Sequence, residues 1–189
     1  MLQVVIQGRG GQGAQTAGNL LAAAFFAAGQ QVQCFASYGG ARRGTPVSSM
    51  LRVDERPIRL RCDIEGADAL LCFDASLLTP ALLACTAERT LLVVNAARPA
   101  AELAAALPTV QARQLLPVDG LGIARRHGLG RIVNSALIGG LARAVGAPPL
   151  PTLLQTLQQT SPRQHEQNLA ACRDGWQAVD ALLREEACR

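Results

Sequence analysis

The residues with the clearest chemical pattern form the segment GRGGQG at positions 8–13. It follows a short apolar run at 3–7 and precedes an apolar segment at 15–28, so the sequence predicts a strand, a glycine turn and a buried helix in that order. Glycines allow positive φ in such a turn, and they let a phosphate group approach the backbone amides at the start of a helix. The spacing also matches the G-x-G-x-x-G pattern of dinucleotide-binding domains. The candidate binding residues are therefore Gly8, Arg9, Gly10, Gly11, Gln12 and Gly13.

Three uses of this turn are open from the residues alone. The first is NAD(P) or nucleotide binding by a free-standing Rossmann-like protein. That fingerprint also requires an acidic residue at the end of the second strand, and the segment 33–37 (QCFAS) contains none. The other two are a phosphate-binding loop for a different ligand, and a turn that is structural or docks a partner chain. A Walker A loop is excluded, because no Lys-Ser or Lys-Thr pair follows the glycines.

A second candidate group is the pair Arg42 and Arg43, which lies between glycines in the loop 37–46. A guanidinium group suits a phosphate or a carboxylate because it donates two parallel hydrogen bonds. The pair is predicted either to face an anionic ligand or to form ion pairs with another subunit, and a solvated loop is the third interpretation. Arg9 follows the first predicted strand, and it would add a third cation if all three arginines converge on the carboxyl edge of the sheet.

Other polar side chains near these loops have less specific interpretations. Gln12 and Gln15 flank the predicted helix start, where they would either donate to a phosphate or a partner or cap the helix. Asp74 and Asn95 end two predicted strands. For both of them, N-capping of the next helix is favoured over orienting a ligand.

The remaining reactive residue types lack the spacing of a catalytic or metal site. The six cysteines include no C-x-x-C pair, and His127 and His165 are far apart without the neighbours of a triad or a metal site. We therefore predict no catalytic residue, no metal ligand and no cofactor held by this chain alone. The net charge of +4 is not accompanied by a basic stretch rich in aromatic residues, so nucleic acid is not an expected partner. No signal peptide is expected, and the apolar run at 19–29 is too short for a bilayer, so we expect a cytoplasmic protein without membrane contact.

The elements that must position these residues alternate between strand and helix in the first half of the chain. Strands are predicted at 3–7, 31–35, 69–73, 91–95 and 111–116, and helices at 15–28, 77–87 and 118–127. A β-hairpin is predicted from 47–53 and 58–61, around a turn at 54–57.

From Val133 onward the pattern is helical, at 133–145, 151–159 and 163–184. Ser161 is the expected N-cap of the last helix, with Pro162 at its first position. The predicted fold is α/β: one Rossmann-like domain over residues 1–189, with a mostly parallel sheet, helices on both faces, an added β-hairpin and a helical C-terminal third.

The glycine turn and the arginine pair together resemble a known family. The loop reads SYGGARRGTPV at 37–47, and Arg52, Pro57 and Ile58 follow it. With GRGGQG upstream, this order is similar to the gamma chain of pyruvate:ferredoxin and related 2-oxoacid:ferredoxin oxidoreductases. Further similar segments are Asp74 after a strand, NSALIGGL at 134–141 and NLAACRDG at 168–175. One departure is the Gly-Ala pair at 40–41, where the family more often has Pro-Glu.

The resemblance implies a non-catalytic subunit of a thiamine-diphosphate enzyme that oxidatively decarboxylates a 2-oxoacid, typically to an acyl-CoA. It implies that thiamine diphosphate, Mg²⁺ and 4Fe–4S clusters belong to the complex, with CoA as co-substrate. The implied partners are alpha, beta and ferredoxin-like subunits, and ferredoxin or an NAD-linked subunit as electron acceptor. The glycine turn and the pair Arg42 and Arg43 are then expected to contact CoA or a partner subunit. Pyruvate, 2-oxoglutarate, branched-chain and aryl 2-oxoacids are alternative substrates.

Overall fold

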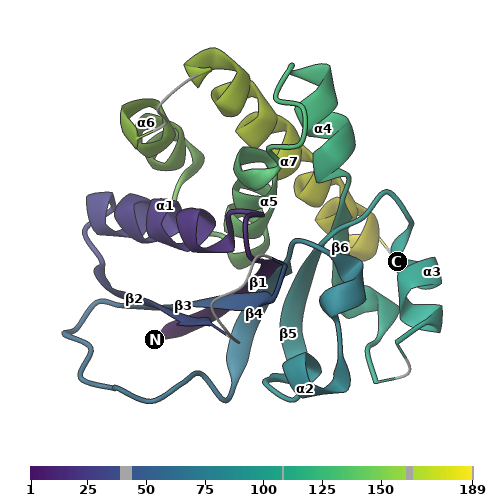
Figure 1. Cartoon of the computed structure of the whole chain (residues 1–189), viewed down its shortest axis with the longest axis horizontal. Coiled ribbons are helices and arrows are strands. Elements are labelled where there is room, and N and C mark those ends of the chain that lie inside the picture. Colours follow the sequence, from purple (N-terminus) through teal and green to yellow (C-terminus); the bar gives the residue numbers. More distant parts are fainter. Residues whose placement is uncertain (39–43, 108, 161–163, 189) are drawn as a thin grey trace.

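The computed structural model describes residues 1–38, 44–107, 109–160 and 164–188. Its centre is a six-stranded sheet with the order β2-β3-β1-β4-β5-β6 (Figure 1). The strands are β1 (Leu2–Arg9), β2 (Gln31–Tyr38), β3 (Pro46–Asp54), β4 (Ala67–Cys72), β5 (Thr86–Asn95) and β6 (Leu115–Val118). β3 is antiparallel to both of its neighbours, whereas β1, β4, β5 and β6 pair in parallel. The mostly parallel sheet was predicted, and its carboxyl edge brings the ends of β1, β4 and β5 together.

The helices cover the two faces of the sheet unequally (Figure 1). One side carries α1 (Ala14–Ala27), α4 (Gly120–Arg126), α5 (Asn134–Val145), α6 (Leu150–Thr160) and α7 (His165–Ala187). The other side carries only short elements: α2 (Pro80–Leu83), α3 (Ala100–Ala105) and the 3-10 turns η1 (Ala75–Leu77) and η2 (Ala112–Gln114). None of the helices in the described ranges has the length and apolar character of a membrane span.

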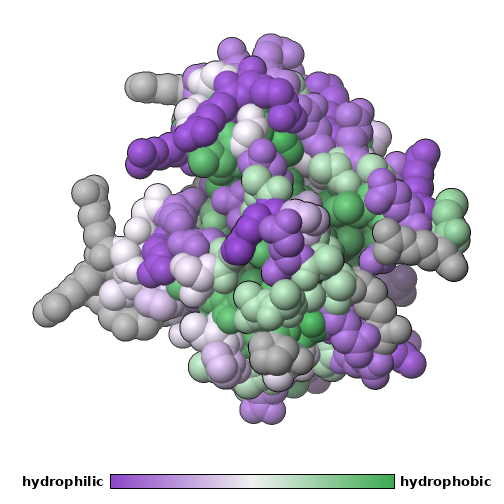
Figure 2. Space-filling model, turned by 90° about the vertical axis from the view of Figure 1, so that its right-hand side faces the viewer, coloured by the Kyte–Doolittle hydropathy of each residue, from purple (hydrophilic) through white to green (hydrophobic). Residues whose placement is uncertain are grey.

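The alternation of side chains along the strands divides the core in two. Val4 and Ile6 are fully buried on the side of α1 and α5, whereas Val5 and Leu70 are buried on the side of α2 and α3. Seen from the side that carries α3, hydrophobic residues gather just below the centre of the view, while hydrophilic residues line the top and the lower right (Figure 2). An apolar groove of about 340 Å³ lies there, lined by Leu78, Pro80, Leu83, Ala84, Ala106, Leu107 and Thr109.

The predicted hairpin is wrong in its second strand. Residues 47–53 do form a strand, but β3 pairs with β2 on one side and with β1 on the other. Residues 58–61 form no strand; they lie in the loop from β3 to β4. This loop is held by Arg52, which is 1% exposed and donates to the carbonyl oxygens of Cys62 and Asp63 at 2.9 and 3.1 Å. The segment 58–61 (IRLR) is short, and the eight-residue pairing of β2 with β3 satisfies the backbone of β3 on that side instead.

The predicted helix at 77–87 is also wrong in extent. The segment is broken into η1 and α2, and β5 already begins at Thr86. Pro80 is the reason, because proline has no N–H and is tolerated only in the first turn of a helix. Thr79 accordingly caps the new start by accepting from the N–H of Leu82. The strand predicted at 111–116 begins later, at Leu115, and α3 was not predicted.

The three predicted C-terminal helices are present. α7 begins at His165 rather than 163, after Gln164 with φ 55°, and the predicted cap residues Ser161 and Pro162 lie outside the described residues.

α5 and α7 cross closely because both carry glycine at the crossing. A Cβ on Gly139 would collide with the carbonyl oxygen of Cys172, and one on Gly175 with that of Ala136.

Candidate functional site

A cleft of about 680 Å³ opens at the carboxyl edge of β1, β4 and β5. Parallel sheets bind ligands at this edge, so the position agrees with the fold-level expectation. Its lining residues come from the glycine turn, from the ends of two strands and from the segment that runs from α4 to the start of α5: Gly11, Gln12, Gly13, Phe73, Asn95, Leu121, Arg125, Arg131, Ile132, Val133 and Asn134.

The glycine turn forms one wall of the cleft. Gly11 and Gly13 have φ values of 94° and 91°, in the left-handed region that favours glycine. Gly13 is the N-cap of α1 and offers no side chain to the free N–H groups of the first helical turn. Within the described residues, the N–H groups of Gly11 and Gly13 have no hydrogen-bond acceptor. The turn therefore presents free backbone donors at the start of a 14-residue helix, as a phosphate-binding turn requires.

Gln12 and Gln15 are engaged with the protein itself. Oε1 of Gln12 accepts from the backbone N–H of Arg9 at 2.7 Å, which closes the glycine turn. Nε2 of Gln15 donates to Oδ1 of Asn19 at 2.9 Å, and Oε1 of Gln15 is buried without a partner among the described residues. Gln12 thus supports the shape of the turn, although it also lines the cleft.

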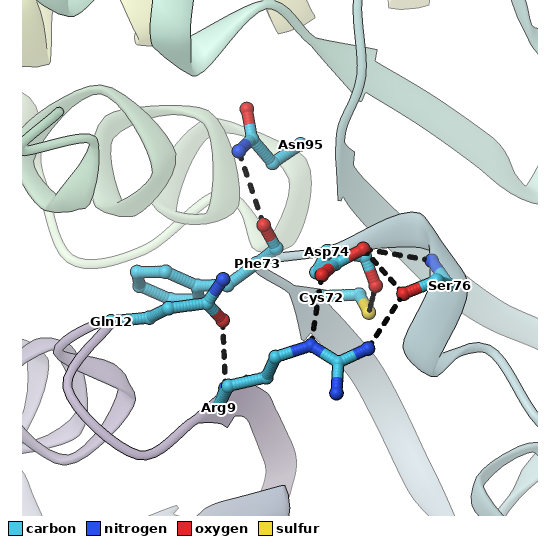
Figure 3. Close-up of polar contacts among 7 residues, drawn as sticks. All are labelled: Arg9, Gln12, Cys72, Phe73, Asp74, Ser76 and Asn95. Carbon is cyan, nitrogen blue, oxygen red and sulfur yellow. Dashed lines mark hydrogen bonds and ion pairs between the residues drawn. The ribbon is translucent and has the colours of Figure 1, made fainter. Parts of the chain in front are cut away.

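Arg9 points to the end of β4 and forms an ion pair there (Figure 3). Its Nε donates to Asp74 at 3.1 Å and one terminal nitrogen donates to the hydroxyl of Ser76 at 2.9 Å. Partial burial raises the pKa of Asp74, but hydrogen bonds from Ser76 and Arg9 outweigh it and hold this pKa below its ordinary value. The charge of Arg9 is therefore compensated locally. Arg42 and Arg43, the other two arginines of the predicted convergence, lie outside the described residues.

The strand-end residues have distinct structural roles. Asp74 caps η1 as predicted, because its carboxylate accepts from the backbone N–H of Ser76 at 3.0 Å. Asn95 is not a cap: its Nδ2 donates to the carbonyl of Phe73 and its Oδ1 accepts from the N–H of Gly120, both at 3.1 Å. It thereby ties the ends of β4 and β5 to the start of α4 (Figure 3 shows the first of these bonds).

The opposite wall holds two arginines that sequence reasoning missed. Arg125 lies in the last turn of α4 and Arg131 in the turn before α5; both are exposed, and neither has an ion pair within the described part of the chain. Their neighbour Arg126 differs, since it pairs with Asp174 at 3.2 Å. Asn134 joins the two walls by donating from Nδ2 to the carbonyl of Gly13 at 3.1 Å. The only sequence signal was the glycine-rich turn before the NSALIGGL helix.

The strand order argues against the dinucleotide interpretation of the turn. In that interpretation the strand beside β1 ends next to the glycine turn and carries the acid for the ribose. Here the neighbour on that side is antiparallel β3, and β2 lies beyond it, about 9–10 Å from β1 at the usual strand spacing. The segment 33–37 is therefore both without an acid and displaced by one strand.

A sequence model of the pyruvate ferredoxin/flavodoxin oxidoreductase family matches residues 3–178. The chain belongs to this family. The common gamma subunit of the pyruvate/ketoisovalerate oxidoreductases of Pyrococcus abyssi is 35% identical over 179 residues, which cover 94% of this chain and 96% of that subunit.

Solved structures similar to this gamma-type chain include one from Thermotoga maritima and one from Magnetococcus marinus. The crystal structure of the pyruvate oxidoreductase subunit PORC from Thermotoga maritima has a TM-score of 0.81 and 28% identity, and the match covers 93% of this chain and 95% of that one. A 2-oxoglutarate:ferredoxin oxidoreductase from Magnetococcus marinus shares the fold over 95% of this chain and 31% of its own, with a TM-score of 0.67 and 19% identity.

The chain is thus a gamma subunit of a 2-oxoacid:ferredoxin oxidoreductase, a non-catalytic part of an enzyme complex with other subunits. The resemblance found from the glycine turn and the double-arginine loop is confirmed, and so is the α/β fold class. The alternative of a free-standing NAD(P)-binding protein is wrong.

Proposed function

We propose that this gamma subunit packs on the catalytic subunits of its complex and contacts CoA at the carboxyl edge of its sheet. The observation that carries the proposal is the cleft at that edge, whose glycine wall offers the N–H groups of Gly11 and Gly13. Free amides at the start of a helix suit a phosphate group, and CoA carries several. The Magnetococcus marinus enzyme, which shares the fold, has CoA and succinyl-CoA bound.

In this proposal the site residues contribute binding and no bond-breaking step. Gly8, Gly10, Gly11 and Gly13 let the backbone approach the ligand, while Arg9 and Gln12 hold the turn in shape. Arg42 and Arg43 supply positive charge from the loop that precedes β3. We treat residues 1–189 as one gamma-type domain, since the family match runs from residue 3 to 178.

The remaining cofactors are proposed to lie on the partners, which we take to be alpha, beta and ferredoxin-like subunits in the cytoplasm. Thiamine diphosphate with Mg²⁺ would supply the decarboxylation chemistry, and 4Fe–4S clusters would pass electrons to ferredoxin or an NAD-linked subunit. The apolar groove at Leu78, Leu83 and Leu107 supports packing against another subunit, because the short helices there cover the sheet thinly. The relatives' substrates, pyruvate and ketoisovalerate, are the first 2-oxoacids to assay.

The test uses the purified complex with the double variant Arg42→Ala/Arg43→Ala. Loss of a charge-assisted hydrogen bond costs about 1.5–3 kcal/mol, so we expect the KM for CoA to rise about tenfold or more. The KM for the 2-oxoacid and the subunit composition should not change. The matched control is Arg59→Ala/Arg61→Ala, two exposed arginines in the loop after β3, at the opposite edge of the sheet. An unchanged KM for CoA in a fully assembled complex would contradict the CoA contact.

A further inference from the structure

The strand β2 is the outer strand of the sheet at the end away from β6. It pairs with β3 over eight residues without a bulge, and no other backbone segment in the described ranges bonds to its outer N–H and C=O groups. Outer strands are usually short, or carry charged side chains, a proline or a bulge, and these features hinder pairing with another chain. β2 (QVQCFASY) has none of them, whereas β6 is four residues long and contains Pro117. The edge of β2 is therefore open to a further strand.

An exposed aromatic side chain stands beside this edge on the helical face of the sheet. α1 lies over β2 and β3 (Figure 1). Asn19 and Phe26 are on the same side of α1, because seven residues make about two helical turns. That side lies next to β2, since Oδ1 of Asn19 accepts from the thiol of Cys34 at 3.7 Å. Phe26 is 71% exposed, which is unusual for a large apolar side chain.

A second apolar side chain stands beside the same strand on the opposite face of the sheet. Nε2 of Gln33 donates to the carbonyl of Leu60 at 2.7 Å, and Leu60 is 44% exposed. Gln33 and Cys34 are consecutive in β2, so their side chains point to opposite faces. Phe26 and Leu60 therefore flank the open edge from above and below. A chain that pairs with β2 would bury apolar surface on both faces of the sheet.

A second copy of this chain fits the edge in charge and in shape. The chain has a net charge of +4, but β2 has no charged residue, so two antiparallel copies of it place no like charges opposite one another. A contact about a two-fold axis is self-complementary and closed. At the usual strand spacing, a helix centred over β2 and β3 lies about 5 Å from such an axis. Two copies of α1 would then be about 10 Å apart, which is the distance between packed helices.

We propose that the gamma subunit pairs with a second copy of itself through β2. The antiparallel contact joins the two six-stranded sheets into one and buries Phe26 between the two copies of α1. A strand from another subunit would satisfy the edge but would bring no second α1 to cover Phe26. No residue of β2 lines the cleft at the carboxyl edge or the apolar groove, so both stay open for CoA and for the catalytic subunits. The pairing would bring two sets of catalytic subunits into one complex, and it does not depend on the CoA contact.

The experiment measures the mass of the full-length subunit by sedimentation equilibrium over a range of concentrations. We expect twice the monomer mass of 19.8 kDa. Phe26→Glu buries an unpaired carboxylate in the contact and should raise the dissociation constant about tenfold or more, while Phe26→Leu should raise it less. Ser37→Lys adds a charge at an exposed position of β2 and should also raise it about tenfold. The matched control is Ala101→Lys on α3, an exposed position beside β6, which should leave it within about twofold.

Hydrogen exchange identifies the contact. The outer amides of β2 should exchange slowly in the wild-type dimer and fast in the Phe26→Glu variant, because pairing alone protects them. The replaced side chains are exposed, and unchanged circular dichroism of each variant checks that the fold persists.

A wild-type subunit that stays monomeric at every concentration would overturn the inference. A dimer equally strong in all variants would also overturn it, since the contact would then lie elsewhere. If the subunit is monomeric and β2 is protected only in the whole complex, the edge takes a strand of another subunit, and the second copy is wrong. The KM for CoA of Arg42→Ala/Arg43→Ala bears on the CoA contact alone, so failure of either proposal is seen separately.

Discussion

Arg9 and Asp74 link the end of β1 to the end of β4, and the link sets the shape of the glycine turn. The backbone of Arg9 is bound to Gln12, while its side chain is held by Asp74 and Ser76 (Figure 3). Both charged side chains are partly exposed, so the pair contributes position more than stability. A residue that seemed a ligand-binding cation from the sequence is therefore better described as a support of the turn.

The Asp74→Asn variant tests this support. We expect a loss of about 0.5–1 kcal/mol in the free energy of unfolding at pH 7, from the weakened ion pair with Arg9, because asparagine caps a helix about as well as aspartate does. The pKa of Asp74 is lowered in the folded protein, so its contribution is complete above the unfolded value of about 3.9 and disappears as the pH falls through the folded value. Urea unfolding at pH 7 and pH 3 measures the difference. A difference between variant and wild type that persists undiminished at pH 3 would contradict the role of the carboxylate.

At the scale of elements, the crossing of α5 and α7 depends on two glycines. Gly175 has no room for a Cβ because the carbonyl of Ala136 occupies that position, and the backbone of a helix cannot yield as a side chain does. Gly175→Ala should therefore destabilise the subunit by about 1–3 kcal/mol, despite the higher helix propensity of alanine. The control is Gly66→Ala, where a Cβ meets no atom within 4 Å; its effect should be within about 1 kcal/mol. Equal stability of the two variants in thermal unfolding would show that the backbones of α5 and α7 have room for a Cβ at position 175.

Local sequence patterns predicted most helices and strands. They gave wrong elements where a pairing with a distant strand, or a single proline, determines the local structure. The runs at 3–7 and 15–28 carry enough apolar residues to define β1 and α1. The segment 58–61 looks equally strand-like, but the choice of partner for β3 is made by β1 and β2, which local sequence does not reveal. The prediction of one helix at 77–87 followed the helical pattern of apolar residues and gave Pro80 too little weight. Proline at that position prevents a continuous helix.

At the scale of the whole molecule, the cleft unites parts of the chain that are more than a hundred residues apart. Gly13 and Asn134 are joined by one hydrogen bond across 121 positions, and Arg125 and Arg131 belong to the same distant segment. The glycine turn could be predicted because it is formed by consecutive residues, 8–13. The arginines opposite could not, because their position follows from the strand order that places β4 between β1 and β5.

A ligand that bridges the two walls should stabilise the entire subunit, because one wall comes from residues 11–13 and the other from residues 121–134. Binding to the folded state alone adds about 2.7 kcal/mol at a ligand concentration of 100 times Kd. For a chain of 189 residues, each kcal/mol shifts Tm by about 2–4 °C, so CoA at that concentration should raise Tm by about 5–10 °C. Differential scanning fluorimetry of the isolated subunit measures this shift. The double variant Arg125→Ala/Arg131→Ala removes both cleft arginines and should unfold at the same temperature with and without CoA. Arg126→Ala, whose charge is paired with Asp174 outside the cleft lining, should keep the full shift. A rise in Tm that survives in the double variant would locate the bound phosphates elsewhere on the subunit.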